Sequence, residues 1–274
     1  MLERNSIKSP HKNRATEPQK GARPGSEGPH RATMDAARYA TQSISPVFVL
    51  ASSFYAIVDP YAGHEPVQLA KLLLGGGAEV LQLRLKQASG REFLAKARQI
   101  ASLCRGCGAL FIVNDRADVA LLAGADGVHL GQEDLPLEAA RKLLGSSRLV
   151  GISTHSIQQA VEAERDGADY IGFGPLFAGG ARNTATGQGL DLLRQVRASV
   201  KLPIVAIGAI TEERLPEVLA AGADAAAIIS DVVTAPDVRA KVRSIVTQCA
   251  AREAGRAGAP AGGEKTAKPP KEPA

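Results

Sequence analysis

The stretch Gly77-Ala-Glu-Val-Leu-Gln-Leu83 joins a Gly-Ala-acid turn to a short apolar run. The same turn recurs before three further apolar runs, at Gly124-Ala-Asp126, Gly167-Ala-Asp169 and Gly222-Ala-Asp224. The intervals between successive turns are 47, 43 and 55 residues, and each interval is long enough for two strand–helix units. The repeat therefore predicts a chain built from four similar quarters.

Four more apolar runs lie between the repeats, at Phe54–Val58, Leu110–Val113, Leu149–Ile152 and Pro203–Ile207. Helical periodicity follows the runs in Pro66–Leu74, Arg91–Leu103, Ala139–Leu144, Ile157–Glu164 and Arg214–Ala221. Eight strands that alternate with helices predict an α/β fold, a single closed (β/α)₈ TIM barrel. An open doubly wound sheet is the alternative, but it would not explain four similar quarters.

Composition divides the 274 residues into three parts. Residues 1–45 contain eight Lys or Arg and four Asp or Glu, and residues 250–274 contain five and three, so residues 46–249 carry 5 − 4 − 2 = −1 of the formal charge of +5. We predict the barrel over 46–249 and disordered extensions at both ends, because the ends have little apolar surface to bury. Neither end interleaves aromatic residues with its basic charge, so nucleic acid is not an expected partner.

The chain has no apolar run of the roughly 18–20 residues that a membrane span needs, and no secretory signal is evident. Three cysteines in this length are typical of a reducing compartment. We therefore expect a cytoplasmic protein that acts on small molecules, and the sequence leaves a homo-oligomer open. Cys104-Arg-Gly-Cys107 has redox or zinc spacing, but it lies past a predicted helix without a second pair and is interpreted as incidental.

Active sites of TIM barrels lie at the carboxyl ends of the strands. The predicted second strand presents Gln82, Arg84 and Lys86 at alternate positions, which places the three side chains on one face, the barrel interior. One interpretation pairs Arg84 and Lys86 with the acids of the first and third strands. The other gives them a polyanion such as a diphosphate, and the spacing favours this second interpretation.

Asp115 and Asp134 follow the third and fourth predicted strands. Two carboxylates beside two cations are typical of a magnesium–diphosphate site, whereas the alternative is that Asp115 caps a helix over Arg116–Leu122. After the last two strands, Gly208 and Ile229-Ser230 indicate a phosphate cup. No Ser–His–Asp or Cys–His arrangement is evident. Two phosphate sites on one rim, one of them metal-assisted, suggest an enzyme that joins a diphosphate to a monophosphate.

The sequence resembles the thiamine phosphate synthase family over roughly residues 53–246. Eight stretches carry the resemblance in the family's order. They are Tyr55-Ala-Ile-Val-Asp59, Gln82-Leu-Arg-Leu-Lys86, Ile112-Val-Asn-Asp-Arg116, Ala125-Asp-Gly-Val-His-Leu-Gly-Gln-Glu-Asp134, Gly151-Ile-Ser-Thr-His155, Gly172-Phe-Gly-Pro175, Pro203-Ile-Val-Ala-Ile-Gly208 and Ala221-Gly-Ala-Asp224.

The resemblance implies a Mg²⁺-dependent transferase that joins 4-amino-2-methyl-5-hydroxymethylpyrimidine diphosphate to thiazole phosphate and releases diphosphate. The resemblance also implies that departure of the diphosphate precedes attack by the thiazole nitrogen. The resemblance implies that Asp115 and Asp134 are the metal ligands, and that Arg84, Lys86 and Ser153 are the candidate catalytic residues. The implied substrate-binding residues are Gln82, Arg84, Lys86, Asn114, Ser153, Arg182, Gly208, Ile229 and Ser230.

The loop after Phe177 departs from the family's Thr-x-Thr-Lys pattern, because it contains Gly179-Gly-Ala-Arg182. Both hydroxyls are missing and Arg182 retains only the cation. Two alternatives therefore remain: a catalytically weak ligand-binding relative, and an isomerase similar to the thiazole tautomerases with His155 as its base. The complete diphosphate set argues against the isomerase, which expels no diphosphate. His129 is predicted to be a hydrogen-bonded interior residue.

Overall fold

The aspartate of each Gly-Ala-Asp turn binds a backbone amide near the start of the strand before it. The contacts are Phe111 N to Asp126 Oδ2 at 2.8 Å, Val150 N to Asp169 Oδ2 at 2.7 Å and Ile204 N to Asp224 Oδ2 at 2.9 Å. At the first repeat the backbone carbonyl of Glu79 accepts from Leu110 N instead, at 2.8 Å. The repeated turn therefore joins neighbouring strands at their amino ends, because it satisfies amides that would otherwise lack partners.

The computed structural model describes residues 52–179 and 186–257. Within these residues eight parallel strands close into a barrel in chain order, and β8 pairs with β1. The strands are β1 (Phe54–Val58), β2 (Val80–Leu83), β3 (Leu110–Asn114), β4 (Gly127–Leu130), β5 (Leu149–Thr154), β6 (Tyr170–Phe173), β7 (Ile204–Ile207) and β8 (Ala225–Ala227). The predicted TIM barrel is confirmed.

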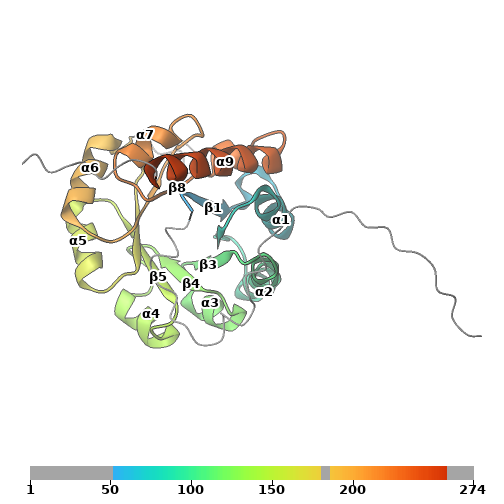
Figure 1. Cartoon of the computed structure of the whole chain (residues 1–274). Helices are drawn as coiled ribbons and strands as arrows, with labels where there is room; N and C mark the ends of the chain where they lie inside the picture. Colours follow the sequence, from blue (N-terminus) through green and yellow to red (C-terminus); the bar gives the residue numbers. More distant parts are fainter. Residues whose placement is uncertain (1–51, 180–185, 258–274) are drawn as a thin grey trace, which may run out of the picture. The chain divides into compact units, whose positions relative to one another are not determined.

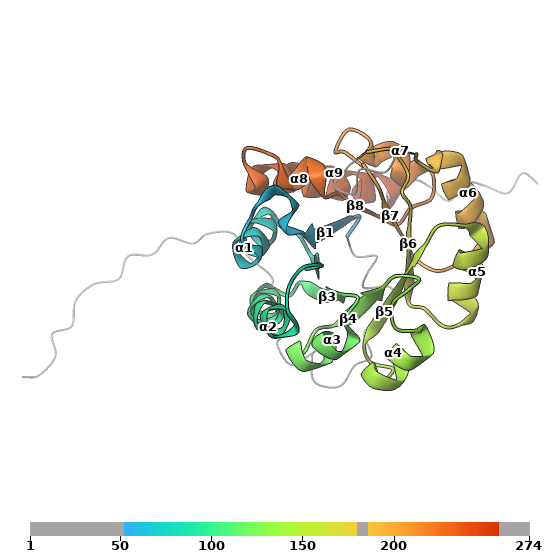
Figure 2. The ribbon, with the colours of Figure 1, turned by 180° about the vertical axis from the view of Figure 1, so that it is seen from behind.

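The helices surround the strands, as Figure 1 shows from one end of the barrel and Figure 2 from the other. They are α1 (Pro66–Gly76), α2 (Gly90–Cys107), α3 (Ala117–Ala123), α4 (Leu137–Leu144), α5 (Ile157–Arg165), α6 (Gly189–Ser199), α7 (Leu215–Ala220), α8 (Ser230–Val233) and α9 (Val238–Ala257), with a 3₁₀ turn η3 (Pro60–Ala62) after β1. Almost every strand residue is buried, since helices cover the outside and side chains fill the inside.

The last helix changes one predicted boundary. Helix α9 continues to Ala257, so residues 250–257 are helical and the barrel does not end at 249 as predicted. This helix packs closely on α1, where a Cβ atom at Gly76 would lie 2.6 Å from the Cβ of Val242. The predicted extension over 1–45 and the tail from 258 onward lie outside the described residues.

The cysteine pair is also placed differently from the prediction. Cys104 and Cys107 lie in the last turn of α2, not past it. Cys104 is buried and Cys107 is exposed, and both are free thiols. No helix in the described part of the chain combines the length and apolar content that crossing a membrane requires.

Candidate active site at the carboxyl ends of the strands

A cavity of about 30 Å³ opens inside the carboxyl-terminal end of the barrel. Three predicted substrate-binding residues line it: Gln82, Asn114 and Ser153. Gln82 and Asn114 are buried. The strands therefore bring these three side chains together as predicted, and the pocket walls between them include Ile57 and Val205.

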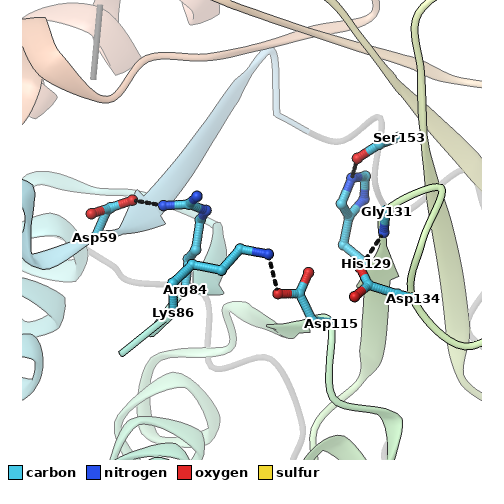
Figure 3. A network of polar contacts seen from close by, with 8 residues as sticks. All are labelled: Asp59, Arg84, Lys86, Asp115, His129, Gly131, Asp134 and Ser153. Carbon is cyan, nitrogen blue, oxygen red and sulfur yellow. Dashed lines mark hydrogen bonds and ion pairs between the residues drawn. The ribbon is translucent and has the colours of Figure 1, made fainter. Parts of the chain in front are cut away.

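The two cations beside the pocket follow β2, because this strand ends at Leu83. Arg84 Nη1 donates to Asp59 Oδ2 at 2.5 Å, and Lys86 forms an ion pair with Asp115 (Figure 3). The Lys86 side chain is 47% exposed, so its predicted position in the barrel interior is wrong: the chain has left the strand at this point. Both acid pairings considered from the sequence are present.

Arg84 differs from Lys86 in its surroundings. Its side chain is largely buried, and its Nε atom is buried without a hydrogen-bond partner among the described residues. A buried donor without a partner is costly. The guanidinium group therefore has capacity for another acceptor beyond Asp59, such as a phosphate oxygen.

Asp115 has a left-handed backbone, with φ of 64°, and its amide donates to the His129 carbonyl at 2.8 Å. Helix α3 begins at Ala117 after Arg116 and has no side-chain cap. The alternative that Asp115 caps this helix is therefore wrong. Its carboxylate is directed to Lys86 instead.

Asp134 lies next to Asp115 at the ends of β3 and β4 (Figure 3). Its Oδ2 accepts from the Gly131 amide at 2.6 Å. Burial raises the pKa of Asp134, and so do a hydrogen bond with Asp115 and the charge of that carboxylate. The two predicted metal ligands therefore lie next to each other at the rim, close enough for the charge of Asp115 to act on Asp134.

A hydrogen-bonded chain of side chains crosses the barrel beneath the pocket. Gln82 Nε2 donates to Tyr55 Oη at 3.0 Å, and the two tyrosine hydroxyls of Tyr55 and Tyr170 are 2.9 Å apart. His129 continues the chain, with Nδ1 at 3.1 Å from Tyr170 Oη and Nε2 at 3.0 Å from Ser153 Oγ. The predicted hydrogen-bonded interior role of His129 is confirmed. The structure also reveals a Ser–His pair where the sequence suggested none.

The predicted phosphate cup comes from the loops after β7 and β8. Gly208 has φ of +112°, and a Cβ there would lie 2.5 Å from the Cα of Pro175, so only glycine fits. Ser230 begins α8, directly after Ile229. These elements adjoin one another, because Glu212 N donates to Asp231 Oδ2 at 2.9 Å. Arg182 lies outside the described residues.

The family model described as thiamine monophosphate synthase matches residues 54–232. A thiamine-phosphate synthase of Methanoculleus marisnigri is 48% identical over 193 residues, which cover 70% of this chain and 92% of the relative. The chain belongs to the thiamine-phosphate synthase family. Another family member, from Moorella thermoacetica, is 47% identical over 190 residues, 68% of this chain and 90% of the relative.

A solved structure titled thiamine phosphate pyrophosphorylase, from Pyrococcus furiosus, superposes with a TM-score of 0.66. It is 41% identical, and the match covers 72% of this chain and 96% of that chain. The predicted thiamine-phosphate synthase family, and with it the predicted transferase class, is confirmed.

The sequence did not predict that Tyr170 lines the pocket of this thiamine-phosphate synthase family member. It lies in β6, fully buried, and lines the pocket. The clue in the sequence was a tyrosine hydroxyl within an otherwise apolar strand. The structure adds that glycine lies directly opposite, because Gly151 pairs with Tyr170 between β5 and β6. A Cβ at Gly151 would lie 2.1 Å from the Tyr170 ring.

His155 lines the same pocket. Its Nδ1 lies 2.6 Å from the Gly174 carbonyl, its amide donates to Gln159 Oε1, and it directly precedes Ser156, the N-cap of α5. These contacts give His155 a structural function at the start of α5.

Proposed function

We propose that this rim joins 4-amino-2-methyl-5-hydroxymethylpyrimidine diphosphate to thiazole phosphate in a Mg²⁺-dependent reaction that releases diphosphate. The observation that carries the proposal is the approach of Asp115 and Asp134 to each other beside Lys86, next to the pocket that Gln82 and Ser153 line. Membership of the thiamine-phosphate synthase family supports the identity of both substrates.

The donor set of the rim fits Mg²⁺. Two carboxylates held together repel each other unless a proton or a cation lies between them. Burial raises the pKa of Asp134, and the neighbouring Asp115 carboxylate raises it further. Among the described residues no group of three or more His, Cys, Asp or Glu could hold a metal. Two carboxylates with water and substrate phosphates are an ordinary Mg²⁺ environment. When bound there, Mg²⁺ would neutralise charge on the departing diphosphate.

Arg84 and Lys86 supply the protein's own positive charge to the diphosphate. Arg84 is held by Asp59 and retains free donors, whereas Lys86 extends to the carboxylate of Asp115. The largely buried Arg84 is thus fixed in place before a substrate arrives, and such preorganisation lowers the cost of stabilising the leaving group. Asn114, buried at the end of β3, would add a neutral contact to the same substrate.

The reaction needs little acid–base chemistry from the protein. The bond between the pyrimidine's exocyclic methylene carbon and the diphosphate oxygen breaks, and its electron pair leaves with the diphosphate. The thiazole nitrogen then donates its lone pair to the methylene carbon. The side chains therefore have to bind and orient the two substrates and to exclude water from the site. Tyr55 and Tyr170, which line the pocket and are buried, suit a site with little water.

The second substrate is assigned to the opposite side of the rim. Gly208, Ile229 and Ser230 would bind the thiazole phosphate through backbone amides and a hydroxyl, supported by the close approach that Gly208 permits. Arg182 is proposed as a cationic contact to the same phosphate. We also propose that the protein is cytoplasmic and that it forms a homo-oligomer.

The decisive experiment is a steady-state assay of diphosphate release with both substrates, with and without Mg²⁺. We expect release only when both substrates and the metal are present. Asp115→Asn and Asp134→Asn should each abolish Mg²⁺-linked binding of inorganic diphosphate in titration calorimetry, whereas Asp118→Asn, an exposed carboxylate paired with Arg116, should not. Binding of both substrates without turnover would support the weak ligand-binding relative. Metal-free interconversion of thiazole isomers would support the isomerase.

A further inference from the structure

Two neighbouring loops meet where β6 and β7 end, and backbone hydrogen bonds join them. The two strands lie side by side in the barrel (Figure 2). Beyond the strands, Leu176 N donates to the Ile207 carbonyl at 2.9 Å. One residue further on, Phe177 N donates to the Gly208 carbonyl at 3.2 Å. The contact between the strands therefore continues into the loops, as far as the glycine that is proposed to bind thiazole phosphate.

The guanidinium group of Arg214 contacts both of these loops. Its Cζ lies 4.3 Å from the centroid of the Phe177 ring, in the loop after β6. Its Nη1 donates to the carbonyl of Ala209, in the loop after β7, at 3.0 Å. A cation over the face of an aromatic ring is attracted to it, so one side chain holds two loops through two different groups. We call Phe177, Ala209 and Arg214 the loop clamp.

The loop clamp acts on a turn with an unfavourable backbone. Gly208 and Ala209 both have positive φ, of +112° and 48°, and alanine disfavours this region because of its Cβ atom. A strained conformation persists only where its surroundings hold it. Arg214 binds the carbonyl of the strained residue itself, and it therefore restrains the turn at the point where it would otherwise relax.

The backbone that carries Arg214 is itself fixed. Arg214 directly precedes α7, and its amide donates to the Thr211 carbonyl at 3.1 Å. Its neighbour Leu215 is buried, whereas Arg214 is exposed. The side chain therefore extends from a firm base along the surface and back over the two loops.

We propose that Arg214 is a positioning residue that clamps the loop after β6 to the loop after β7, and that it thereby holds the Gly208 turn ready for a phosphate monoester. Arg214 acts through Phe177 and Ala209 and does not contact the phosphate. A cup built from backbone amides binds an anion well when the amides are fixed beforehand, because their ordering is otherwise a cost of binding. The ligand in this inference rests on the proposed function, whereas the joining of the two loops does not.

A neutral substitution separates the loop clamp from the positive charge of Arg214. If Arg214 attracted the phosphate by its charge, the Phe177 ring would be irrelevant to binding. If Arg214 acts through the ring, Phe177→Leu also weakens binding, although it changes no charge. We expect Arg214→Met and Phe177→Leu each to raise the Kd for thiazole phosphate about fivefold, the factor for one exposed cation–aromatic contact. The double variant should bind no worse than Arg214→Met alone.

Titration calorimetry measures these affinities, and two further variants control them. Phe177→Tyr keeps an aromatic face and should retain the affinity of the wild type. Arg194→Met removes an exposed arginine that is paired with Asp191 on α6, and it should change nothing. In steady-state assays the KM for thiazole phosphate should rise while kcat and the KM for the pyrimidine diphosphate hold, a split that general destabilisation would not produce. An unchanged Kd in Phe177→Leu, or additive losses in the double variant, would overturn the proposal.

The joining of the loops can be measured without any substrate. The Phe177 amide is bonded to the Gly208 carbonyl, so its hydrogen exchange reports how often this contact opens. In the full-length protein we expect this amide to exchange about fivefold faster in Arg214→Met than in the wild type, and at the wild-type rate in Arg194→Met. The Ile171 amide, bonded to the Pro203 carbonyl at the other end of the same strands, should keep its rate and so show that the barrel is intact. Equal exchange of the Phe177 amide in Arg214→Met and wild type would overturn the loop clamp.

The two proposals fail in different ways. Faster exchange at Phe177 in Arg214→Met, together with an unchanged Kd for thiazole phosphate, would overturn the positioning role even if thiamine phosphate is still formed. A wild-type protein that binds no thiazole phosphate, but whose Phe177 exchange responds to Arg214→Met as expected, would instead contradict the proposed function and support the joining of the loops.

Discussion

Lys86 forms an ion pair with Asp115, one of the two carboxylates proposed to bind Mg²⁺. The ammonium group therefore competes with the metal for this carboxylate before the diphosphate arrives. Once the diphosphate is bound, Lys86 can turn to a phosphate oxygen while Asp115 turns to the metal. The Lys86 side chain thus weakens the binding of free Mg²⁺ and strengthens the binding of Mg²⁺ together with diphosphate.

Replacement of Lys86 should consequently shift two affinities in opposite directions. For Lys86→Met we expect Mg²⁺ alone to bind about two- to fivefold more tightly, because a half-exposed ion pair no longer competes. We expect inorganic diphosphate with Mg²⁺ to bind about tenfold more weakly, because a charge-assisted contact is lost. Calorimetric titrations measure both. Lys96→Met, which breaks the ion pair with Glu65, is the control and should change neither affinity. If Lys86→Met weakened both affinities in parallel, Lys86 would not compete with Mg²⁺ for Asp115.

Lys241 of α9 joins the two loops of the proposed phosphate cup. Its Nζ lies 2.8 Å from Glu212 Oε2 and 2.9 Å from Asp231 Oδ2. For Lys241→Met we expect the KM for thiazole phosphate to rise about tenfold, because the two acids would repel each other and separate the loops. The KM for the pyrimidine diphosphate should hold. Lys241→Arg should restore most of the affinity, and exposed Lys71→Met is the control. Equal changes in both KM values would indicate general destabilisation.

Two glycines give opposite expectations for stability. Gly151→Ala would place a Cβ within 2.1 Å of the Tyr170 ring, and we expect it to lower the free energy of unfolding by about 1–3 kcal/mol or more. Gly106→Ala in α2 meets nothing within 4 Å, and we expect a gain of about 0.4–1 kcal/mol, because the unfolded chain loses freedom. Urea denaturation of both variants checks the pair. A neutral Gly151→Ala would show that the Tyr170 ring can move.

Alkaline pH should destabilise the fold through Cys249. Burial, with the charge of Glu253, raises the pKa of this thiol from 9.0 to about 11. The unfolded chain releases the proton first, so stability falls as pH rises from about 9 and the loss is complete near pH 11, at about 2–3 kcal/mol. Urea unfolding under reducing conditions at pH 8, 9 and 10 measures the slope. Cys249→Ala should flatten it, whereas Cys107→Ala, at an exposed thiol, should not.

The sequence carried enough information for the barrel because its signals are local. Each Gly-Ala-acid turn lies next to the strand that it introduces, and the contact of Asp169 with the Val150 amide repeats at Asp126 and Asp224. Strand ends were less certain. Alternation suggested that β2 continues to Lys86, but the strand ends at Leu83 and the chain turns at Lys86.

The site could be predicted where a residue lies at the carboxyl end of a strand or shortly after it. Asp115, directly after β3, and Asp134, a short loop after β4, met this condition, and they lie next to each other. The partnership of Ser153 with Tyr170 through His129 did not, because these residues come from three strands and only closure of the barrel makes them neighbours. Sequence spacing contains no information on which inward-facing side chains meet across the interior.

The aspartate contacts at the amino ends of β3, β5 and β7 also bear on how this protein can evolve. They join neighbouring strands at the end of the barrel remote from the pocket. The loops at the other end therefore do not have to hold the strands together. Insertions or exchanges in those loops can therefore accumulate without unravelling the scaffold. A lineage can drift toward a new ligand without passing through an unstable ancestor.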